Sequence, residues 1–494
     1  MILQRPELER VLGTRVPSAV ARIEGVTHDS RQARPGFVFV AVPGFRRDGV
    51  EFVPEAIRRG ATLIVSERAI SGATPGVPTV IVPDARSALA ALACAVHGNP
   101  SAAMDVYGVT GTNGKTTTSY ALYGILEAAF GERACGLMTT AEIVAGGERR
   151  PAAHTTPEAV EVQGTLAEML AGGTRRVVME VSSHGIELQR VSGTRFAGAI
   201  FTNLTRDHLD LHGSMEAYYA AKRELFYRTS GPKLANAEDA WGRRLAGEIE
   251  GVKTFGGTDD ADYRVADVRD TRYGTIFTLR HSGGMVELRT PLLGPYNVLN
   301  VAGAAALALE VGVEEEDLAR AAREMAQVPG RFERVAKREE YGFEVIVDYA
   351  HTDVGLEAVL KVARGAANAA SADGHAGRII CVFGAAGDRD RAKRPLMGRV
   401  ASNLADFSVV TTDDAYSEDP EKIASEVAAG SDSSRTEIIL DRREAIRRAI
   451  TEAREGDVVV VAGKGHERVQ HLPEGDVLFH DASVVEEILR ARGR

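Results

Sequence analysis

The segment Gly111-Thr-Asn-Gly-Lys-Thr-Thr117 constrains the fold of this chain more than any other feature. It follows a strand-like run over 104–109 and precedes a helical stretch over 119–129. In that position, backbone N–H groups and the helix N-terminus can surround phosphate oxygens. Lys115 can neutralise phosphate charge, and the Thr116 hydroxyl can ligate Mg²⁺. We therefore expect a nucleotide-binding loop; the alternative is a glycine-rich turn with a surface lysine.

Strand-like and helical runs alternate along most of the chain. Apolar runs of strand length occupy 36–42, 62–66, 79–82, 176–180, 197–202, 344–348, 378–383, 407–411 and 457–462. Helical patterns cover 85–96 and 300–311. Apolar strands separated by helices are typical of parallel sheets covered on both faces. The sequence predicts an α/β fold of three domains over 1–100, 101–330 and 331–494, with boundaries at Asn99-Pro100-Ser101 and Pro329-Gly330-Arg331.

Charge and cysteine content exclude several classes of protein. The net charge is −10, which disfavours nucleic-acid and anionic-membrane binders. Three scattered cysteines do not make a disulfide framework or a thiolate metal site. The N-terminal segment has no apolar core like that of a signal peptide, and no apolar run is long enough for a membrane span. We expect a cytoplasmic protein with neither nucleic acid nor membrane as a partner.

Glu180 ends a strand-like apolar run and precedes Ser182. A carboxylate in a buried strand is costly unless a metal or hydrogen bonds satisfy it. Glu180 is therefore a candidate magnesium ligand. The alternative is a strand-end carboxylate that faces solvent.

Lys222 lies on the apolar stripe of a predicted helix, on the face formed by Met215, Tyr218, Tyr219, Leu225 and Phe226. Burial lowers the pKa of an amine unless the side chain reaches solvent, which is the alternative here. A neutral amine could react with CO₂ to give a carbamate, an anion that can ligate Mg²⁺. The polar segment 201–212, dense in Asn, Asp and His, suggests a ligand or metal loop, and two metals would explain its many polar groups.

Together these segments resemble the Mur ligase family, and within it the MurE-type branch, which joins a third amino acid to UDP-N-acetylmuramoyl-L-alanyl-D-glutamate. The matching segments run in order along nearly the whole chain: 29–31, 111–117, 154–157, 179–185, 202–210, 219–222, Asn297 with Asn300, 329–333, 348–351, 387–390 with 393–395, and 463–467. The resemblance implies a UDP-sugar-binding N-terminal domain, a central ATPase with a parallel sheet and a C-terminal Rossmann-like domain that binds the amino acid. It also implies a role in peptidoglycan synthesis.

The resemblance implies the following site residues. ATP would contact Gly111, Thr112, Asn113, Gly114, Lys115, Thr116, Thr117, Asn297, Arg331 and Asp348, with His351 close by. The metal ligands would be Thr116, Glu180, His208 and Lys222 as a carbamate. The UDP-sugar dipeptide would contact Ser30, His154, Thr155, Thr156, Ser182 and Arg190. The amino-acid site would be Arg389, Asp413, Asp414, Tyr416, Gly463 and Glu467, with Arg389, Gly463 and Glu467 at the α-carboxylate and α-ammonium.

The implied reaction begins when ATP phosphorylates the D-Glu γ-carboxylate. The amine of the incoming amino acid then attacks the acyl phosphate, and phosphate leaves. Mg²⁺, Lys115 and helix dipoles would offset the charge of the two polyanions. The catalytic set is thus Lys115, Glu180, His208 and Lys222, the cofactors are ATP, Mg²⁺ and CO₂ as a lysine carbamate, and we expect a monomer.

The segment Asp413-Asp-Ala-Tyr416 departs from the family pattern. Branches that add meso-diaminopimelate have Asp-Asn-Pro-Arg here, and the arginine holds the distal carboxylate. Tyr416 lacks that charge and Asp414 adds a carboxylate, so the sequence predicts L-lysine or L-ornithine as the amino acid. The alternative is diaminopimelate, with Arg391 or Arg394 compensating.

Three other functions compete with this interpretation. A sister ligase, such as a folylpolyglutamate synthase or another Mur enzyme, would share the phosphate loop and the lysine. A nucleotide-binding regulator without ligase activity would not need both Glu180 and Lys222. A nucleic-acid ATPase is disfavoured by the net charge and by the lack of a basic stripe.

Overall fold

The computed structural model describes residues 1–44, 47–70, 76–152, 154–207, 209–271, 274–369 and 377–492. The chain separates into two compact units. The first comprises Met1–Val268, Phe277–Leu288 and Leu299–Glu324, and the second Arg269–Ile276, Arg289–Val298 and Met325–Arg494. Neither unit corresponds to one of the three predicted domains, whose boundaries stay a prediction.

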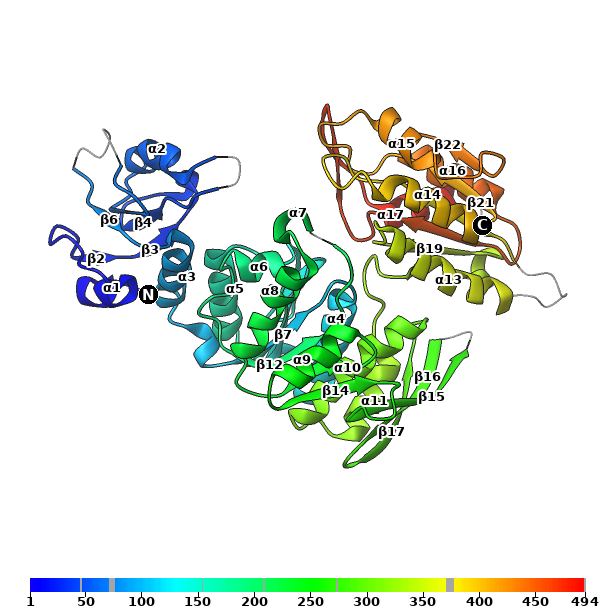
Figure 1. The fold of residues 1–494 in the computed structure, drawn as a ribbon, viewed down its shortest axis with the longest axis horizontal. Coiled ribbons are helices and arrows are strands. Elements are labelled where there is room, and N and C mark those ends of the chain that lie inside the picture. Colours follow the sequence, from blue (N-terminus) through cyan, green and yellow to red (C-terminus); the bar gives the residue numbers. More distant parts are fainter. Residues whose placement is uncertain are drawn as a thin grey trace. The chain divides into compact units, whose positions relative to one another are not determined.

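A small parallel sheet occupies the N-terminal region of the first unit (Figure 1, blue). Its order is β3-β4-β5-β6, with β3 at Gly25–Thr27, β4 at Phe37–Val40, β5 at Leu63–Ser66 and β6 at Thr79–Ile81. The short strands β1 (Leu3–Gln4) and β2 (Arg22–Ile23) pair separately. The helices are α1 (Arg5–Leu12), α2 (Val53–Arg58) and α3 (Ala85–Val96), and α3 begins where the Asp84 carboxylate accepts a hydrogen bond from the Ser87 N–H.

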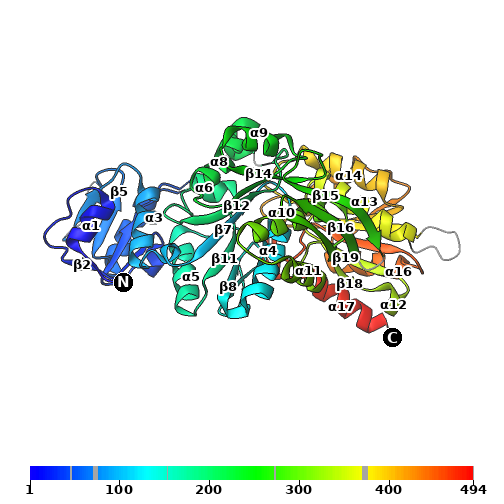
Figure 2. The same ribbon diagram turned by 90° about the horizontal axis from the view of Figure 1, so that it is seen from below.

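An eleven-stranded sheet forms the centre of the chain, in the order β10-β9-β8-β11-β7-β12-β13-β14-β15-β16-β17. The strands are β7 Asp105–Thr110, β8 Cys135–Met138, β9 Glu142–Ala145, β10 Glu148–Pro151, β11 Arg176–Glu180, β12 Phe196–Phe201, β13 Lys233–Asn236, β14 Val252–Gly256, β15 Tyr263–Thr271, β16 Gly274–His281 and β17 Gly284–Thr290. Figure 2 shows β8, β11, β7 and β12 side by side, and all four run parallel. The carboxyl ends of β7, β11 and β12 therefore meet at one edge, which is where ligands bind in such sheets.

Helices cover the parallel part of this sheet. They are α4 Lys115–Phe130, α5 Ala159–Ala171, α6 Ser183–Glu187, α7 Leu209–His212, α8 Met215–Tyr227, α9 Ala240–Glu248, α10 Pro295–Glu310 and α11 Glu315–Glu324. The buried side chains of α8 are Tyr218, Tyr219, Ala221, Lys222, Leu225 and Phe226. This confirms the predicted stripe, and all four of its aromatic and leucine side chains join one apolar cluster with residues of β7, β11 and β12.

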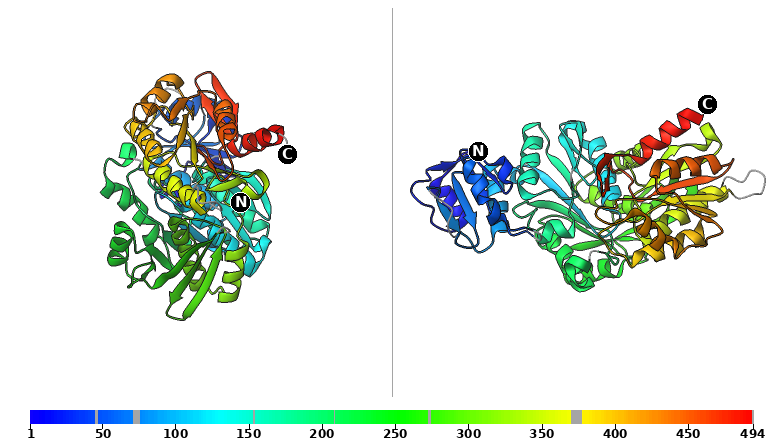
Figure 3. Two further views of the ribbon diagram at one scale, coloured as in Figure 1. Left: turned by 90° about the vertical axis from the view of Figure 1, so that its right-hand side faces the viewer. Right: turned by 90° about the horizontal axis from the view of Figure 1, so that it is seen from above.

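The second unit contains a six-stranded sheet in the order β18-β19-β23-β20-β21-β22. Its strands are β18 Glu333–Ala336, β19 Glu344–Asp348, β20 Ile379–Phe383, β21 Phe407–Val410, β22 Thr436–Ile438 and β23 Val458–Ala462, and the separate hairpin is β24 Val469–Leu472 with β25 Gly475–Leu478. The helices are α12 Arg338–Tyr341, α13 Asp353–Ala369, α14 Lys393–Leu404, α15 Pro420–Ala428, α16 Arg442–Glu452 and α17 Asp481–Arg492. The C-terminal helix α17, red in Figure 3, packs beside α16.

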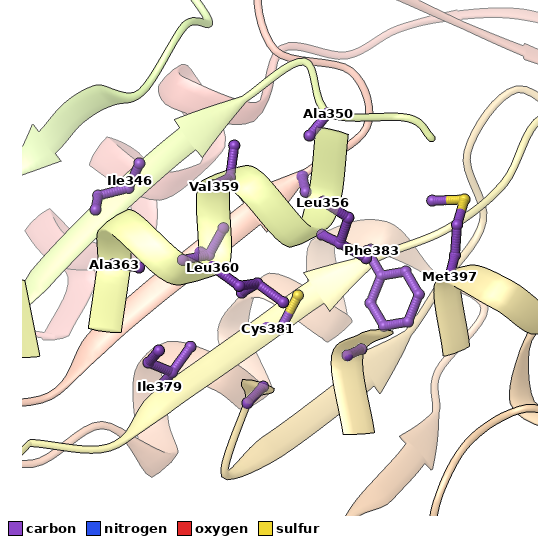
Figure 4. Packing of buried hydrophobic residues seen from close by; sticks show 14 of the residues in the cluster. Ile346, Ala350, Leu356, Val359, Leu360, Ala363, Ile379, Cys381, Phe383 and Met397 are labelled. Atoms are coloured by element: carbon purple, nitrogen blue, oxygen red, sulfur yellow. The ribbon is translucent and has the colours of Figure 1, made fainter. Parts of the chain in front are cut away.

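Two apolar layers enclose this sheet. Figure 4 shows Leu356, Leu360 and Ala363 of α13 over Cys381 and its neighbours on β20. The second layer joins the other face of the strands to α16 and α17. A strand apolar on both faces is what the continuous apolar runs of the sequence predicted.

The structure confirms the α/β class and corrects two details. The sheets are not purely parallel, because β9 and β10 pair antiparallel at one edge of the central sheet, and β18 pairs antiparallel with β19. Helix α4 begins at Lys115 rather than 119, because Gly114 in the left-handed region leads directly into it. The turn residues before that point therefore belong to the strand–helix junction itself.

Candidate active site

The phosphate loop requires glycine at two positions. Gly111 has φ 151° and Gly114 has φ 85°, both in the region that L side chains rarely adopt. A Cβ on Gly111 would lie 1.9 Å from Thr202 Oγ1, and one on Gly114 would lie 2.2 Å from Asn300 Oδ1. Thr202 and Asn300 thus leave no room for a side chain at these two positions, and only glycine fits there.

Residues after β12 hold the loop in place. The Thr202 hydroxyl donates to the Asn113 carbonyl at 2.6 Å, and Asn203 Nδ2 donates to the same oxygen at 3.0 Å. In return the Asn113 N–H donates to Asn203 Oδ1 at 3.0 Å. The sequence predicted a ligand or metal loop in this segment. The structure shows that Thr202 and Asn203 support the phosphate loop.

The Lys115 ammonium group lies over its own loop. Its Nζ donates to the carbonyls of Gly111 and Thr112 at 3.1 and 2.9 Å. Thr116 follows at the start of α4 and is buried. The cation and the hydroxyl that a nucleotide phosphate and its Mg²⁺ require therefore stand together at the helix N-terminus.

Glu180 is fully buried at the end of β11, so the solvent-facing alternative is wrong. Its two carboxylate oxygens accept hydrogen bonds from the backbone N–H and the hydroxyl of Thr140, at 3.0 and 3.1 Å. Within the described ranges, no lysine or arginine forms an ion pair with it. A buried carboxylate held only by neutral donors fits a divalent cation as its missing partner.

Lys222 is 1% exposed, so its side chain does not reach solvent. Its Nζ donates to the Gly111 carbonyl at 2.7 Å and lies 4.5 Å from the centroid of the Tyr218 ring. Burial, assisted by the positive charge of Lys115, lowers the pKa of Lys222 well below its usual value. Lys222 therefore lies against the phosphate loop, in surroundings that favour the neutral amine.

His208, the remaining predicted metal ligand, lies outside the described residues. Within the residues that the structure describes, no group of three His, Cys, Asp or Glu side chains is arranged to hold a metal ion. A contact that the sequence did not indicate occurs nearby: His212 stacks on Tyr218 and lies 3.0 Å from the Ser183 hydroxyl. Tyr218 in turn lies 3.3 Å from the Thr112 hydroxyl, which connects this group to the phosphate loop.

Four of the predicted UDP-substrate residues form one hydrogen-bonded cluster beside Glu180. The Thr155 hydroxyl lies 3.0 Å from the Thr140 hydroxyl, and Thr156 donates to the Glu180 carbonyl at 3.1 Å. Ser182 and Arg190 both bond to Thr156, through its hydroxyl and its carbonyl respectively.

The other two UDP-substrate candidates differ in exposure. His154 is exposed. Ser30, in the small N-terminal sheet region, is buried and donates to Glu55 at 2.7 Å. In the described part of the chain, neither residue hydrogen-bonds to the cluster around Thr156.

The other nucleotide candidates lie in the second unit. The Asp348 carboxylate ends β19 and accepts from the N–H groups of Phe332 and Ala350, at 2.6 and 2.7 Å. Burial raises the pKa of Asp348, against the opposing charge of Arg331. The Arg331 guanidinium lies 4.4 Å from the Tyr349 ring centroid, and His351 Nδ1 lies 2.8 Å from the Tyr349 carbonyl. Asn297, elsewhere in this unit, donates to the Leu293 carbonyl at 2.8 Å.

A buried lysine organises the predicted amino-acid site. Lys464 is fully buried, and its Nζ lies 2.8 Å from both Asp414 Oδ1 and Glu467 Oε2. Burial alone would lower the pKa of Lys464, but the surrounding carboxylates outweigh it and raise that pKa. Burial raises the pKa of Glu467, against the charge of Lys464. Asp413 stands close by, since a Cβ on Gly463 would lie 2.5 Å from Asp413 Oδ2.

The arginines of this region have distinct partners. Arg394 is fully buried and binds Glu418 through both terminal nitrogens and Glu426 through one. Arg391 also pairs with Glu426. Arg389 is exposed, and its guanidinium lies 5.4 Å from the Tyr416 ring centroid. Among the described residues no carboxylate pairs with Arg389, so it is the arginine of the three that can accept an anion.

Lys464, Thr140 and the bracing role of Asn203 were not predicted from the sequence. One signal pointed toward Lys464, because only nine of the 59 basic residues are lysine. Its charge partner Asp414 lies fifty residues earlier, so the pairing itself carried no local pattern.

Comparisons with known proteins match the chain along its length. Residues 22–97 match the "Mur ligase family, catalytic domain", residues 109–308 the "Mur ligase middle domain" and residues 330–465 the "Mur ligase, glutamate ligase domain". The UDP-N-acetylmuramoyl-L-alanyl-D-glutamate–2,6-diaminopimelate ligase of Gloeobacter violaceus is 43% identical over 475 residues, 95% of this chain and 94% of that protein. The ligase of the same name from Aquifex aeolicus is 40% identical and covers 96% of this chain and 95% of its own.

Solved structures agree. A UDP-N-acetylmuramoyl-L-alanyl-D-glutamate–2,6-diaminopimelate ligase is 29% identical, with a TM-score of 0.67 and complete coverage of both chains. A folylpolyglutamate synthase from Mycobacterium tuberculosis is 17% identical, with a TM-score of 0.62 over 82% of this chain and 95% of its own. That second likeness concerns the fold alone.

Proposed function

The chain belongs to the Mur ligase family and is an ATP-dependent acid–amino-acid ligase, and we propose on this premise which substrates it joins. The acceptor is UDP-N-acetylmuramoyl-L-alanyl-D-glutamate, and the amino acid added to it is a diamino acid. The observation that carries this proposal is the arrangement at one sheet edge. A phosphate loop, a fully buried carboxylate without a cationic partner among the described residues and a buried amine meet there, at Gly111, Glu180 and Lys222. These groups are the ones needed to bind ATP with a divalent cation and to transfer its γ-phosphate to a carboxylate.

The reaction would proceed in two displacements. An oxygen of the D-Glu γ-carboxylate attacks the γ-phosphorus of ATP, the bond to the bridging oxygen breaks, and ADP leaves. The amine then attacks the acyl carbon, the carbon–oxygen bond to phosphate breaks, and the amide and inorganic phosphate form. In the first step Lys115 would turn from the carbonyls of Gly111 and Thr112 to the phosphate oxygens.

We propose Thr116, Glu180, His208 and carboxylated Lys222 as the residues that hold Mg²⁺, which would offset phosphate charge when bound. Two features support a carbamate on Lys222. The lowered pKa makes the neutral, CO₂-reactive amine available. A carbamate also keeps one N–H, so the hydrogen bond to Gly111 can persist after CO₂ adds.

We assign the remaining residues by the resemblance. Arg331, Asp348, Asn297 and His351 would contact the nucleotide, and Ser30, His154, Thr155, Thr156, Ser182 and Arg190 the UDP-sugar dipeptide. Gly463 and Glu467 would face the α-carboxylate and the α-ammonium of the incoming amino acid. Arg389, which the resemblance places with them, we reassign to the distal carboxylate. We further propose a monomer that works in the cytoplasm. Within the described residues, no helix is long and apolar enough to cross a membrane.

For the amino acid we propose diaminopimelate, the alternative raised from the sequence, in preference to lysine or ornithine. The expectation of a distal ammonium relied on the charge of Asp414, yet that carboxylate is paired with Lys464. Compensation by Arg391 or Arg394 has no support either, since both are committed to glutamates. Arg389 can serve a distal carboxylate, and relatives about 40% identical carry diaminopimelate in their names.

A specificity panel tests this proposal. The purified protein is supplied with ATP, Mg²⁺, UDP-N-acetylmuramoyl-L-Ala-D-Glu and one of meso-diaminopimelate, L-lysine or L-ornithine, and phosphate release and the product mass are recorded. We expect tripeptide formation with diaminopimelate at the highest kcat/KM. Higher kcat/KM with lysine or ornithine would reverse the amino-acid assignment. Folate-dependent glutamate addition without any UDP product would instead favour a folylpolyglutamate synthase.

A further inference from the structure

The loop Asp413–Tyr416 is held by the β24–β25 hairpin, which no sequence motif connects with it. Gln470 Nε2 donates to the carbonyls of Thr412 and Asp413, at 3.2 and 3.1 Å. The His471 N–H donates to Asp414 Oδ1 at 2.9 Å. The Tyr416 N–H donates to the His471 carbonyl at 3.1 Å. Four hydrogen bonds between this loop segment and two consecutive hairpin residues thus hold the loop, three donated by the hairpin and one by Tyr416.

Tyr416 needs this support because its φ is 51°, a left-handed conformation that is costly for a residue with a bulky side chain. Its ring stacks on the ring of His471, with centroids 5.3 Å apart and an interplanar angle of 12°. His471 is held in turn by Asp476 of β25, whose carboxylate lies 2.7 Å from Nδ1. The hairpin therefore fixes both the backbone and the ring of Tyr416.

The ring of Tyr416 is also the surface against which Arg389 lies. By the resemblance described above, Tyr416 stands at the position of the arginine of the Asp-Asn-Pro-Arg pattern. The Arg389 guanidinium therefore stands close to the place of the arginine that this chain lacks.

We propose that His471 is a specificity-positioning residue: by stacking on Tyr416 it places the Arg389 guanidinium where it binds the distal carboxylate of a diamino dicarboxylic acid. The inference rests on the proposed function and adds a residue and an element to it. Lysine has no distal carboxylate, so its use does not depend on this placement.

The test compares His471→Ala, His471→Phe and the control His480→Ala, a histidine that follows the same hairpin and contacts Ser483 instead. Kinetics are measured with diaminopimelate and with lysine. For His471→Ala we expect the KM for diaminopimelate to rise roughly tenfold, the size expected for loss of a stacked aromatic pair. The KM values for ATP and for the UDP-dipeptide should stay unchanged, and the preference for diaminopimelate over lysine should shrink by a similar factor. His471→Phe keeps a stacking ring and should restore most of the preference, and His480→Ala should match the wild type.

The outcomes distinguish failure of the proposed ligase function from failure of the role proposed for His471. If the wild type forms no tripeptide with any diamino acid, the proposed function fails, and the specificity role fails with it. If the wild type forms the tripeptide but His471→Ala keeps its preference, only the role of His471 is overturned. An equal loss with both amino acids, or a rise in the KM for ATP, would indicate a general structural role and would also overturn it.

Discussion

The Nζ atom of Lys222 lies 2.7 Å from the carbonyl oxygen of Gly111, the first residue of the phosphate loop. Lys115 donates to the same oxygen at 3.1 Å. The Gly111 carbonyl oxygen thus accepts hydrogen bonds from two lysine side chains, one in the phosphate loop and one on α8, more than a hundred residues later.

Lys222→Ala should lower the rate of tripeptide formation roughly 100- to 1000-fold, as expected when a group that stabilises transition-state charge is removed. If the working group is a carbamate, added short-chain carboxylates should restore part of this rate. The rate of phosphate release with and without acetate is the measurement, and ¹³CO₂ labelling followed by NMR checks the carbamate directly. Full activity of the variant, or the absence of a carbamate signal in active wild-type protein, would exclude this role.

The state of Lys222 should also depend on pH in a defined direction. Because its pKa lies well below the usual 10.5, the neutral amine predominates from a lower pH than in an ordinary lysine. After removal of CO₂, activity should return when CO₂ is restored, and at a fixed concentration of dissolved CO₂ the return should become faster as the pH rises through the lowered pKa. Recovery that speeds up only near the usual lysine pKa would contradict a buried, neutral amine.

Gly114→Ala should weaken ATP binding at least about tenfold, because it combines a left-handed conformation, which costs roughly 1–2 kcal/mol, with a contact against Asn300. Gly124→Ala is the matched control on the same helix, where an added Cβ meets nothing within 4 Å. The control should bind ATP normally and gain about 0.5–1 kcal/mol in stability. Calorimetric titration with a non-hydrolysable ATP analogue measures the affinities, and urea denaturation measures the stability. Equal ATP affinities in the two variants would show that the loop tolerates a side chain.

Lys464→Met should destabilise the second unit by about 3–5 kcal/mol, because it leaves the buried Asp414 carboxylate and the half-buried Glu467 carboxylate without their cation. Adding Asp414→Asn and Glu467→Gln to this variant should recover much of the loss, since no uncompensated charge then remains. Urea denaturation of the full chain gives both values. Unchanged stability in the single variant would mean that solvent or another cation replaces the lysine.

Glu418 gives a pH dependence of stability. Its hydrogen bonds with Arg394 lower the pKa of Glu418 from 4.5 to about 2. A carboxylate with a depressed folded pKa contributes stability above its unfolded pKa and loses it as the pH falls through the folded value. Glu418→Gln should therefore lower Tm at pH 7, and the difference from the wild type should shrink from about pH 4.5 toward pH 2. A difference that stays constant over this interval would refute the ion pair as its cause.

Much of the fold could be predicted because it is encoded locally. Helix α3 has the predicted bounds, and the helical stripe correctly placed Lys222 on the inward face of α8 from residue spacing alone. The antiparallel strands β9 and β10 were missed because both are short and the edge strand β10 is exposed, which leaves no long apolar run to recognise. At the site, the phosphate loop and Glu180 carried their own patterns.

The amino-acid site was harder to predict because its character depends on distant pairs. Asp414 considered alone suggested attraction for an ammonium group, whereas its partner Lys464 had no visible connection to it in the sequence. The stacking of Tyr416 on His471 likewise depends on a hairpin that the sequence did not indicate. Charges on a loop can be counted from the sequence, but which of them remain available to a substrate depends on the tertiary fold.

The shared carbonyl of Gly111 has a consequence for the order of events. When a nucleotide draws Lys115 away, that oxygen loses one of its two donors and becomes a better acceptor for the other. Binding of the triphosphate would therefore change the surroundings of the buried Lys222 side chain through this one shared oxygen.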